Sequence, residues 1–298
     1  MNQPRRCQKA TAWQRSQVPD MPKLRIKRFY YRNDRVHAEI REVGGEFHGL
    51  NRTWHFNGQL AEELRYRHGR LHGTSRQWDE NGRLLGSFTM NHGTGTQRYW
   101  HQNEKLRLEI NSFTGKFFGR MRLWLRDGTL VQETYYISNV DVTRAAYLKA
   151  ARKHPDWPQH EGEPAGRVAR EGTALKRKEH ELFIESLLEK SHAEARQWLS
   201  AAKNPGHRSL ARFRTVKAAL QFVETLYAAG ADAVIAALIY TGRREKQFAD
   251  RLLVKLPKAS AKRQALRKIF QDLCVKRGGA LLPDEKDMGE SHLFINLE

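Results

Sequence analysis

Short runs of alternating hydrophobic and polar residues fill residues 29–141, and turn-forming residues separate these runs. Alternation with a period of two is typical of β-strands that bury one face. One pattern recurs five times in this stretch. The clearest copies read HGLNRTWHFNGQLAEELRYRHGRL (residues 48–71) and HGTSRQWDENGRLLGSFTMNHG (residues 72–93). Two more copies begin at Gly95 and Gly119, and a degenerate copy spans residues 30–45.

Four of the copies share one internal spacing. Each begins with a glycine, has a tryptophan five residues later and has a leucine six residues after the tryptophan. Repeat arrays usually present a surface to a partner, so we regard these signature residues as a candidate interaction face. They are Gly49, Gly73, Gly95, Gly119, Trp54, Trp78, Trp100, Trp124, Leu60 and Leu84, with Leu106 and Leu130 as the equivalents of the last two.

An Asn-Gly or related pair lies between each tryptophan and its leucine. Two residues six apart share a face of a hairpin only if the loop has an odd number of residues, because strand side chains alternate. The spacing therefore predicts a three-residue loop closed by a glycine in the left-handed conformation. Glu104 replaces this glycine in one copy, at an expected cost of about 1 kcal/mol. We expect that hairpin to be the loosest, or to have a different turn.

The tryptophan row has two interpretations. As core, each tryptophan packs on its neighbours; as a platform, the row offers aromatic faces to a ligand or to single-stranded nucleic acid. A single-layer sheet has no second layer of its own, so its apolar side must meet the C-terminal helices or a partner. A row of glutamates is expected to pair across strands with nearby arginines. The glutamates are Glu39, Glu63, Glu109 and Glu133, and the arginines are Arg52, Arg76, Arg98, Arg107 and Arg122.

Residues 66–83 (YRHGRLHGTSRQWDENGR) and residues 45–60 resemble the bacterial variant of the MORN repeat. The pattern of that family is roughly Y-x-x-G-K-x-H-G-x-W, then x-N-G-x-L and x-E. The resemblance covers about residues 29–141 and implies a twisted, single-layer sheet of successive hairpins. It also implies binding to a partner, because members of the family are often catalogued as antitoxins or immunity-like partners of bacterial toxins.

The period of two ends after Tyr136, and helical spacing replaces it. We predict helices at residues 143–153, 178–202, 210–229 and 260–276, and strands at residues 233–240, 249–256 and 292–297. Residues 154–172 hold three of the nine prolines and are expected to form an exposed linker. The order of the elements after the linker suggests helices on one face of a small antiparallel sheet.

The predicted fold class is therefore α+β, with a single-layer antiparallel hairpin array followed by a helical linker and a small α+β domain. Its four parts are a basic, disordered tail (residues 1–28), the MORN-like repeats (29–141), a helix with a linker (142–177) and the α+β domain (178–298).

The net charge of +20 is unevenly distributed. Residues 1–28 hold 8 basic and 1 acidic residues, whereas residues 29–141 hold 16 and 13. A solvated basic surface explains this excess. The alternative is a nucleic-acid-associated protein that follows phosphates without reading bases. Its contacts would come from Arg5, Arg6, Lys9, Arg15, Lys23, Arg25, Lys27 and Arg28 in the tail. A further possible anion contact is formed by Arg243, Arg244 and Lys246.

The chain contains no Walker, Rossmann or His-Glu-x-x-His pattern and no paired-cysteine metal spacing. His48 and His72 occupy one turn position of successive repeats, which explains them without a metal. We therefore expect no enzyme activity, no cofactor and no metal. The two cysteines, Cys7 and Cys274, suit a reduced, cytoplasmic protein, and no apolar run is long enough for a signal peptide or a membrane span.

The sequence thus favours a non-catalytic, cytoplasmic bacterial protein whose array binds an unidentified protein partner along the sheet face or its open edge. One alternative is a nucleic-acid-associated protein that uses the basic tail and the C-terminal domain. Another is an antitoxin or immunity-type partner, for which a basic chain would suit a toxin with an acidic surface.

Overall fold

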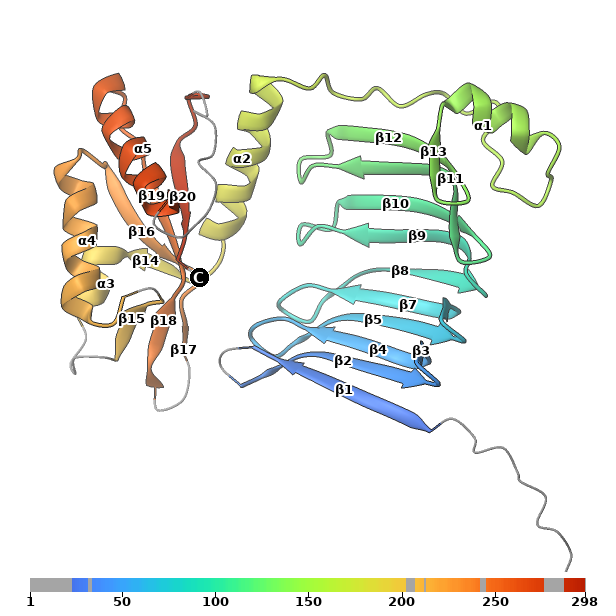
Figure 1. Cartoon of the computed structure of the whole chain (residues 1–298), viewed down its shortest axis with the longest axis horizontal. Coiled ribbons are helices and arrows are strands. Elements are labelled where there is room, and N and C mark those ends of the chain that lie inside the picture. Colours follow the sequence, from blue (N-terminus) through green and yellow to red (C-terminus); the bar gives the residue numbers. More distant parts are fainter. Residues whose placement is uncertain are drawn as a thin grey trace, which may run out of the picture.

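A computed structural model describes residues 23–31, 34–201, 207–211, 213–241, 245–275 and 287–297. The chain forms two parts (Figure 1). The first is a long antiparallel sheet, and the second is a smaller α/β unit that lies beside the ends of the sheet's strands. A short helix, an extended segment and the helix α2 connect them. This arrangement agrees with the predicted α+β class.

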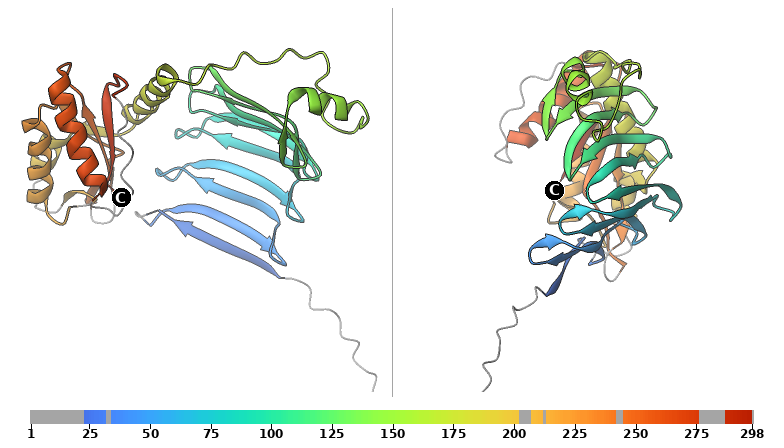
Figure 2. Two further views of the ribbon diagram at one scale, coloured as in Figure 1. Left: turned by 45° about the horizontal axis from the view of Figure 1, so that its top comes forward. Right: turned by 90° about the vertical axis from the view of Figure 1, so that its right-hand side faces the viewer.

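The long sheet has 13 strands, ordered β1-β2-β4-β5-β7-β8-β9-β10-β11-β12-β13, with β3 paired to β2 and β6 to β5. It twists along its length (Figure 2). The strands are β1 (Leu24–Tyr30), β2 (Val36–Val43), β3 (Glu46–Phe47), β4 (Gly49–Trp54), β5 (Leu60–Arg67), β6 (Arg70–Leu71), β7 (Gly73–Trp78), β8 (Leu84–Asn91), β9 (Thr94–Trp100), β10 (Leu106–Phe113), β11 (Lys116–Trp124), β12 (Leu130–Ile137) and β13 (Val140–Val142).

The hairpin loops have the predicted three residues. His55 N donates to Gln59 O and Gly58 N to His55 O, both at 2.8 Å, and Gly58 has a φ of 91°. The same pair of hydrogen bonds closes the loops before β8, β10 and β12, and the loop before β2. Glu104 has a φ of 66° in its loop. The alternative of a different turn there is wrong, because this loop closes with the same two hydrogen bonds as the others. The carboxylate of Glu104 lies 2.7 Å from Arg83 of the preceding hairpin.

Side chains link each repeat to the next. Tyr31 Oη donates to Trp54 O at 2.7 Å, and the Nε2 atoms of His55 and His101 lie 2.8 and 2.9 Å from Trp78 O and Trp124 O. Gln77 performs the same task for the remaining repeat, since its Nε2 donates to Trp100 O at 3.1 Å. His55 and His101 therefore serve the stacking of the repeats.

The first strand begins at Leu24, inside the segment that we assigned to the basic tail. The predicted boundary at residue 28 is wrong, because residues 24–30 pair with β2 along their whole length. Lys27 Nζ lies 2.7 Å from a Glu42 carboxylate oxygen, and Arg28 Nε lies 2.9 Å from Glu39. Among the cations proposed for phosphate binding, Arg5, Arg6, Lys9 and Arg15 lie outside the described residues.

The opposite end of the sheet is covered. Helix α1 (Arg144–Ala151) begins at Thr143, whose Oγ1 accepts from Ala146 N at 3.2 Å. Its fully buried Tyr147 packs against Tyr135 of β12 and against Trp157. The chain then returns along β12, where Ala169 N donates to Leu130 O at 2.9 Å.

The second part has three layers. A sheet ordered β14-β16-β19-β20 has α2 on one face and α3, α4 and α5 on the other. The elements are α2 (Thr173–Leu188), β14 (His192–Glu194), α3 (Ala195–Ser200), β15 (Arg208–Leu210), α4 (Val216–Ala228), β16 (Ala233–Ala237), β17 (Tyr240–Thr241), β18 (Gln247–Ala249), β19 (Arg251–Lys255), α5 (Ser260–Val275) and β20 (His292–Asn296). Strands β15, β18 and β17 form a second small sheet.

Successive residues of the central strands point to opposite faces of the sheet, so both faces pack against helices. Val234 and Leu252 point to the core with α3, α4 and α5, whereas Ala237 and Leu253 meet Ile184 of α2. Within the strands predicted at residues 233–240 and 249–256, residues 233–237 form β16 and pair antiparallel with residues 251–255 of β19. Placement of the helices on one face is wrong.

The predicted helix at residues 178–202 is also wrong, since it is divided into α2, β14 and α3. Residues 192–194 pair with residues 235–237 of β16. Glu194 then caps α3, because its carboxylate accepts from Arg196 N and Gln197 N. Its carboxylate also accepts from the hydroxyl of Tyr227 in α4. These tertiary contacts outweigh the helical spacing of the segment.

Candidate functional site

The signature tryptophans lie at the last residues of β4, β7, β9 and β11, beside the hairpin loops. Each is paired across its hairpin with the predicted leucine: Trp54 with Leu60, Trp78 with Leu84, Trp100 with Leu106 and Trp124 with Leu130. All four tryptophans are partly buried. The structure therefore brings the signature tryptophans and leucines together in one row at the loop side of the sheet, whereas the signature glycines lie towards the other ends of the strands.

A β-bulge follows each of these pairs, and the sequence pattern did not predict it. In the second clear repeat the bulge reverses the roles of two leucines, because Leu84 is 51% exposed and Leu85 is buried. Leu84 instead adds apolar surface to the outside of the array.

The ring of Trp100 packs directly on the backbone of the preceding repeat. A Cβ atom added to Gly86 would lie 2.3 Å from Trp100 Cζ2, so only glycine leaves room for the ring. This contact supports the packing interpretation for Trp100. The solvent-accessible part of each ring remains available to a partner.

The signature glycines have a conformational role. Gly49, Gly73, Gly95 and Gly119 have φ values of 84°, 89°, 144° and 90°, which other residues rarely adopt. Gly119 is also closely surrounded, since an added Cβ would lie 3.0 Å from His160 Nε2. These four glycines shape the strands and do not present a side chain to a partner.

The glutamate row is paired with arginines, as expected. Arg52, Arg98 and Arg122 donate through Nε to Glu63, Glu109 and Glu133 at 2.9, 2.9 and 2.6 Å. In the degenerate copy, Arg28 does the same for Glu39, and this hydrogen bond, against the effect of burial, lowers the pKa of that carboxyl group.

Two of the arginines expected in this row have other neighbours. Arg107 lies over the ring of Tyr99, 5.9 Å from its centroid. Arg76 is opposite Ser87 and lies 3.7 Å from Glu63 of the neighbouring hairpin.

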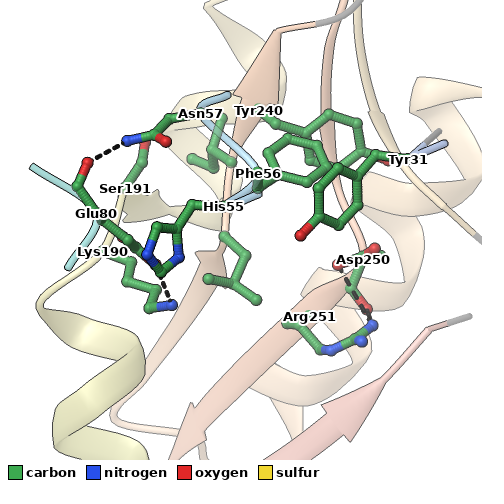
Figure 3. Close-up of a pocket in the computed structure, with 12 residues that line it drawn as sticks. Tyr31, His55, Phe56, Asn57, Glu80, Lys190, Ser191, Tyr240, Asp250 and Arg251 are labelled. Carbon is green, nitrogen blue, oxygen red and sulfur yellow. Dashed lines mark hydrogen bonds and ion pairs between the residues drawn. The ribbon is translucent and has the colours of Figure 1, made fainter. Parts of the chain in front are cut away.

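A cavity of about 470 Å³ lies where the first two loops of the array meet the C-terminal part (Figure 3). Three aromatic rings line this cavity: Tyr31 and Phe56 from the array and Tyr240 from β17. The ring centroids of Tyr31 and Phe56 are 5.0 Å apart, and those of Phe56 and Tyr240 are 4.6 Å apart. Lys190 closes one side, since its Nζ lies 2.6 Å from Glu80. Aromatic packing thus joins the two parts of the molecule.

The loops before β8, β10 and β12 lie beside α2 and the residues after it, and charges hold the last of these loops. Lys178 Nζ lies 2.6 Å from Asp127, and Arg126 pairs with Glu189. Burial raises the pKa of Asp127, but the hydrogen bonds from Lys178 and Thr129 outweigh it and lower the pKa to about 2. A second cavity of about 560 Å³ lies between these loops and α2. The C-terminal part therefore meets the loops of the array, whereas the two faces of the sheet extend away from it (Figure 2).

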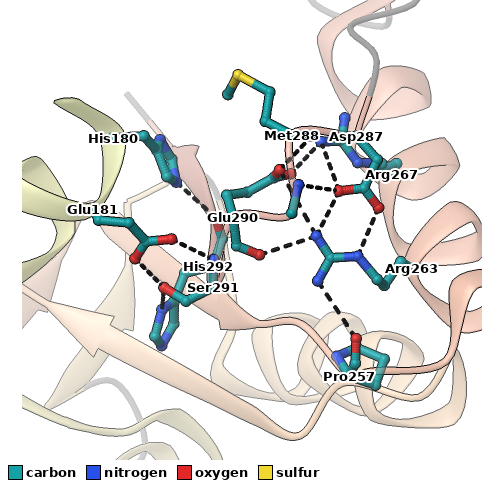
Figure 4. Close-up of polar contacts among 11 residues, drawn as sticks. His180, Glu181, Pro257, Arg263, Arg267, Asp287, Met288, Glu290, Ser291 and His292 are labelled. Carbon is teal, nitrogen blue, oxygen red and sulfur yellow. Dashed lines mark hydrogen bonds and ion pairs between the residues drawn. The ribbon is translucent and has the colours of Figure 1, made fainter. Parts of the chain in front are cut away.

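A polar network joins α2, α5 and the segment before β20 (Figure 4). Arg263 donates to both carboxylate oxygens of Asp287 at 2.6 Å, and Arg267 pairs with the buried Glu290. The hydrogen bond from Arg263 holds the pKa of Asp287 well below its usual range. Ser291 Oγ donates to Glu181 and lies 2.8 Å from His292 Nδ1. Each of these charges has a partner within the network, which fits a role in fastening the segment before β20.

Within the described ranges, no group of three or more histidine, cysteine, aspartate or glutamate side chains could hold a metal ion. The repeat histidines form pairs instead: His48 with His68, at 5.4 Å between ring centroids, and His72 with His92, at 4.2 Å. Of the possible anion contacts, Lys246 is exposed, and Arg243 and Arg244 lie outside the described residues. No helix in the part of the chain that the structure describes is long and apolar enough to cross a membrane.

Residues 47–68 match the family model of the MORN repeat variant. This match runs from the end of β3 through β4 and β5, and it confirms the MORN-like pattern at this position. The other four hairpins close their loops with the same hydrogen bonds as this MORN repeat. Comparison with curated proteins found no match, and neither did comparison with solved structures.

Sequence reasoning missed the strand that begins the array. The run LRIKRFY begins with alternating apolar and basic residues, but its three cations also fit a basic tail. It also missed Lys178 and Lys190, which had no distinguishing pattern because their partners lie far away in the chain.

Proposed function

We propose that this protein is a non-catalytic scaffold that binds a partner protein through its sheet of MORN repeats. The observation that carries the proposal is the contrast between the two ends of the sheet. Among the described residues, β1 pairs only with β2, and all seven of its residues are exposed. A long exposed strand at a sheet edge is a template for pairing with another chain.

The other end of the sheet lacks this property. Strand β13 has only three residues, and it pairs with the last three residues of β12. The returning segment continues this cover, since Gly166 N donates to the carboxylate of Glu133 at 3.1 Å. One end is therefore closed by the chain itself, whereas at the other end no described residue pairs with the outer backbone groups of β1.

The paired state of the charges in the array supports a binding role over catalysis. A catalytic carboxylate generally needs a perturbed pKa in a site open to substrate. Glu63, Glu109 and Glu133 are instead neutralised by arginines across each hairpin. Lys27 and Arg28 are neutralised by glutamates in the same way, which leaves fewer cations on β1 for phosphates.

Identification of a partner followed by mapping of the binary complex tests the proposal. The tagged full chain is used for affinity purification, the partner is made pure, and hydrogen exchange is compared for the free and bound chain. We expect slowed exchange in strands of the array. Protection restricted to residues 173–297 would contradict the proposal.

The nucleic-acid alternative is tested in parallel by fluorescence anisotropy of labelled single-stranded and double-stranded oligonucleotides across a salt series. Binding that persists at physiological salt would favour this alternative. Binding that vanishes with salt would mark a general attraction of a basic chain for phosphates.

A further inference from the structure

The first strand of the array has two chemically different faces. Its register with β2 places Arg25, Lys27 and Phe29 on one face of the sheet, opposite Glu42, Ile40 and Ala38. Leu24 and Ile26, which are 53% and 45% exposed, lie on the other face together with Arg28, whose charge is paired with Glu39. The edge therefore combines a free row of backbone groups with a basic stripe and an apolar stripe.

The basic stripe has unused charge. Residues 23–31 contain Lys23, Arg25, Lys27 and Arg28 and no acidic residue. Lys27 pairs with Glu42 and Arg28 with Glu39, so these two are neutralised within the sheet. Arg25 makes no ion pair or side-chain hydrogen bond among the described residues, although it is exposed. It is available to a group that arrives at the edge.

We propose that β1 binds an extended segment of a partner protein in which acidic and apolar residues alternate, and that this segment adds a strand to the sheet. The inference rests on the proposed scaffold function and specifies its partner. Side chains of an added strand alternate between the two faces of the sheet. The acidic ones then lie beside Arg25 and Lys27, and the apolar ones beside Leu24 and Ile26.

Charge decides between this occupant and a second copy of the chain. Two copies of β1 joined edge to edge would bring three cations from each strand together, and the Arg25 of one copy would meet no acidic side chain in the β1 of the other. Like charges at opposed positions of neighbouring strands are destabilising. The chain's own first 22 residues do not suit β1 as the added strand either, because they contain Arg5, Arg6, Lys9 and Arg15 and only one acidic residue, Asp20.

The test uses the full chain and a fluorescein-labelled peptide of about eight residues, long enough for one strand, in which glutamate and valine alternate. Binding is followed by anisotropy. Arg25→Glu should weaken the binding about tenfold or more, because it replaces an attraction between opposite charges by a repulsion between like charges. The matched control is Arg67→Glu, because Arg67 is also exposed on a strand of the array and has no ion pair among the described residues. We expect this control to bind like the unmodified chain.

Two further peptides separate strand addition from simple charge attraction. In one, lysine replaces glutamate; in the other, the same glutamates and valines are grouped in two blocks. We expect neither to bind with the affinity of the alternating peptide. Equal binding of the blocked peptide, equal weakening by Arg67→Glu, or no binding of the alternating peptide would each overturn the inference.

Sedimentation velocity tests the second-copy alternative. We expect a monomer that Arg25→Glu leaves monomeric. A dimer that the neutral substitution Lys27→Gln strengthens would overturn the inference in favour of pairing between copies.

The outcome can also be separated from that of the scaffold proposal. If a purified partner protects the array but binds the Arg25→Glu variant with unchanged affinity, the scaffold function stands and the inference about β1 falls. If the alternating peptide binds but no purified partner slows hydrogen exchange in the array, the edge of β1 can accept a strand and the scaffold proposal falls.

Discussion

At the scale of single residues, the array depends on glycines for two separable reasons. Gly128 closes a hairpin loop with a φ of 93°, and nothing lies within 4 Å of an added Cβ atom. Gly119 has nearly the same φ, but its surroundings leave no room. The two positions therefore separate backbone strain from close packing.

We expect Gly128→Ala to lower the free energy of unfolding by about 1 kcal/mol, because alanine is strained at positive φ. Gly119→Ala should cost more, about 2–3 kcal/mol, since the new methyl group also presses on Pro158 and His160. Urea unfolding of the two variants measures both values. Equal losses would mean that the residues around Gly119 move aside without cost.

A buried histidine gives the array a dependence on pH. His160 is 5% exposed, and burial lowers its pKa, an effect that its contact with Glu163 only partly offsets. The unfolded chain then binds a proton more readily than the folded one. Stability is therefore full above the unfolded pKa of about 6.5 and decreases as the pH falls below it.

We expect the melting temperature to fall between pH 7.5 and pH 5.5, and His160→Gln to reduce this fall. The unmodified chain and the His160→Gln variant are compared at pH 7.5 as the reference, because there the side chain at position 160 is neutral in both. An unchanged pH dependence in the variant would assign the effect to other groups. His101 and His292, whose pKa values are also lowered by burial, are the next to test.

At the scale of elements, the end of the array is held by α1. Tyr147 is fully buried, and its hydroxyl donates to Pro158 O at 2.7 Å. Burial, together with the neighbouring Tyr135, raises the pKa of Tyr147 to about 12, so the hydroxyl remains protonated and keeps this hydrogen bond at neutral pH. The helix thereby fastens the returning segment over β12.

Removal of only the hydroxyl in Tyr147→Phe should cost about 1 kcal/mol, because the partly buried Pro158 carbonyl loses its donor. Tyr147→Ala should cost about 3–5 kcal/mol through the cavity that it leaves. Thermal unfolding with near-UV circular dichroism follows both changes. If the alanine variant is as stable as the phenylalanine variant, the helix is dispensable for the array.

The hairpins were predicted well because their determinants are local. A tryptophan and its leucine partner lie six residues apart in one hairpin, so their spacing alone specifies the loop. The bulge beside Leu84 was missed, because the choice between Leu84 and Leu85 as the buried residue depends on the neighbouring strand. The break of the helix predicted at residues 178–202 was missed for the same kind of reason, since residues 192–194 pair with a strand about 40 residues later.

At the scale of the whole molecule, a set of ion pairs positions the C-terminal part beside the loops of the array. Lys190 with Glu80, Arg126 with Glu189 and Lys178 with Asp127 all join the two parts. The Lys190 and Glu80 side chains are about one-third exposed, so such a pair contributes about 0.2–1 kcal/mol. Several weak contacts of this kind set the arrangement jointly.

We expect Lys190→Glu to loosen this arrangement, because two carboxylates then face each other. Small-angle X-ray scattering should show a larger radius of gyration, and proteolysis of residues 152–172 should become faster. Adding Glu80→Lys to the first change restores opposite charges and should reverse both effects. Failure of the double variant to recover would assign the first effect to a local change in α2.

The amino-acid sequence by itself determined the number, spacing and loop geometry of the hairpins and the order of most later elements. These features depend on contacts between residues close together in the chain. Only the tertiary structure decided which end of the sheet is open, which faces of the second sheet the helices cover and where the two parts meet. Those outcomes depend on distant pairs such as Lys190 and Glu80, which are 110 residues apart, and no local pattern encodes such a pair.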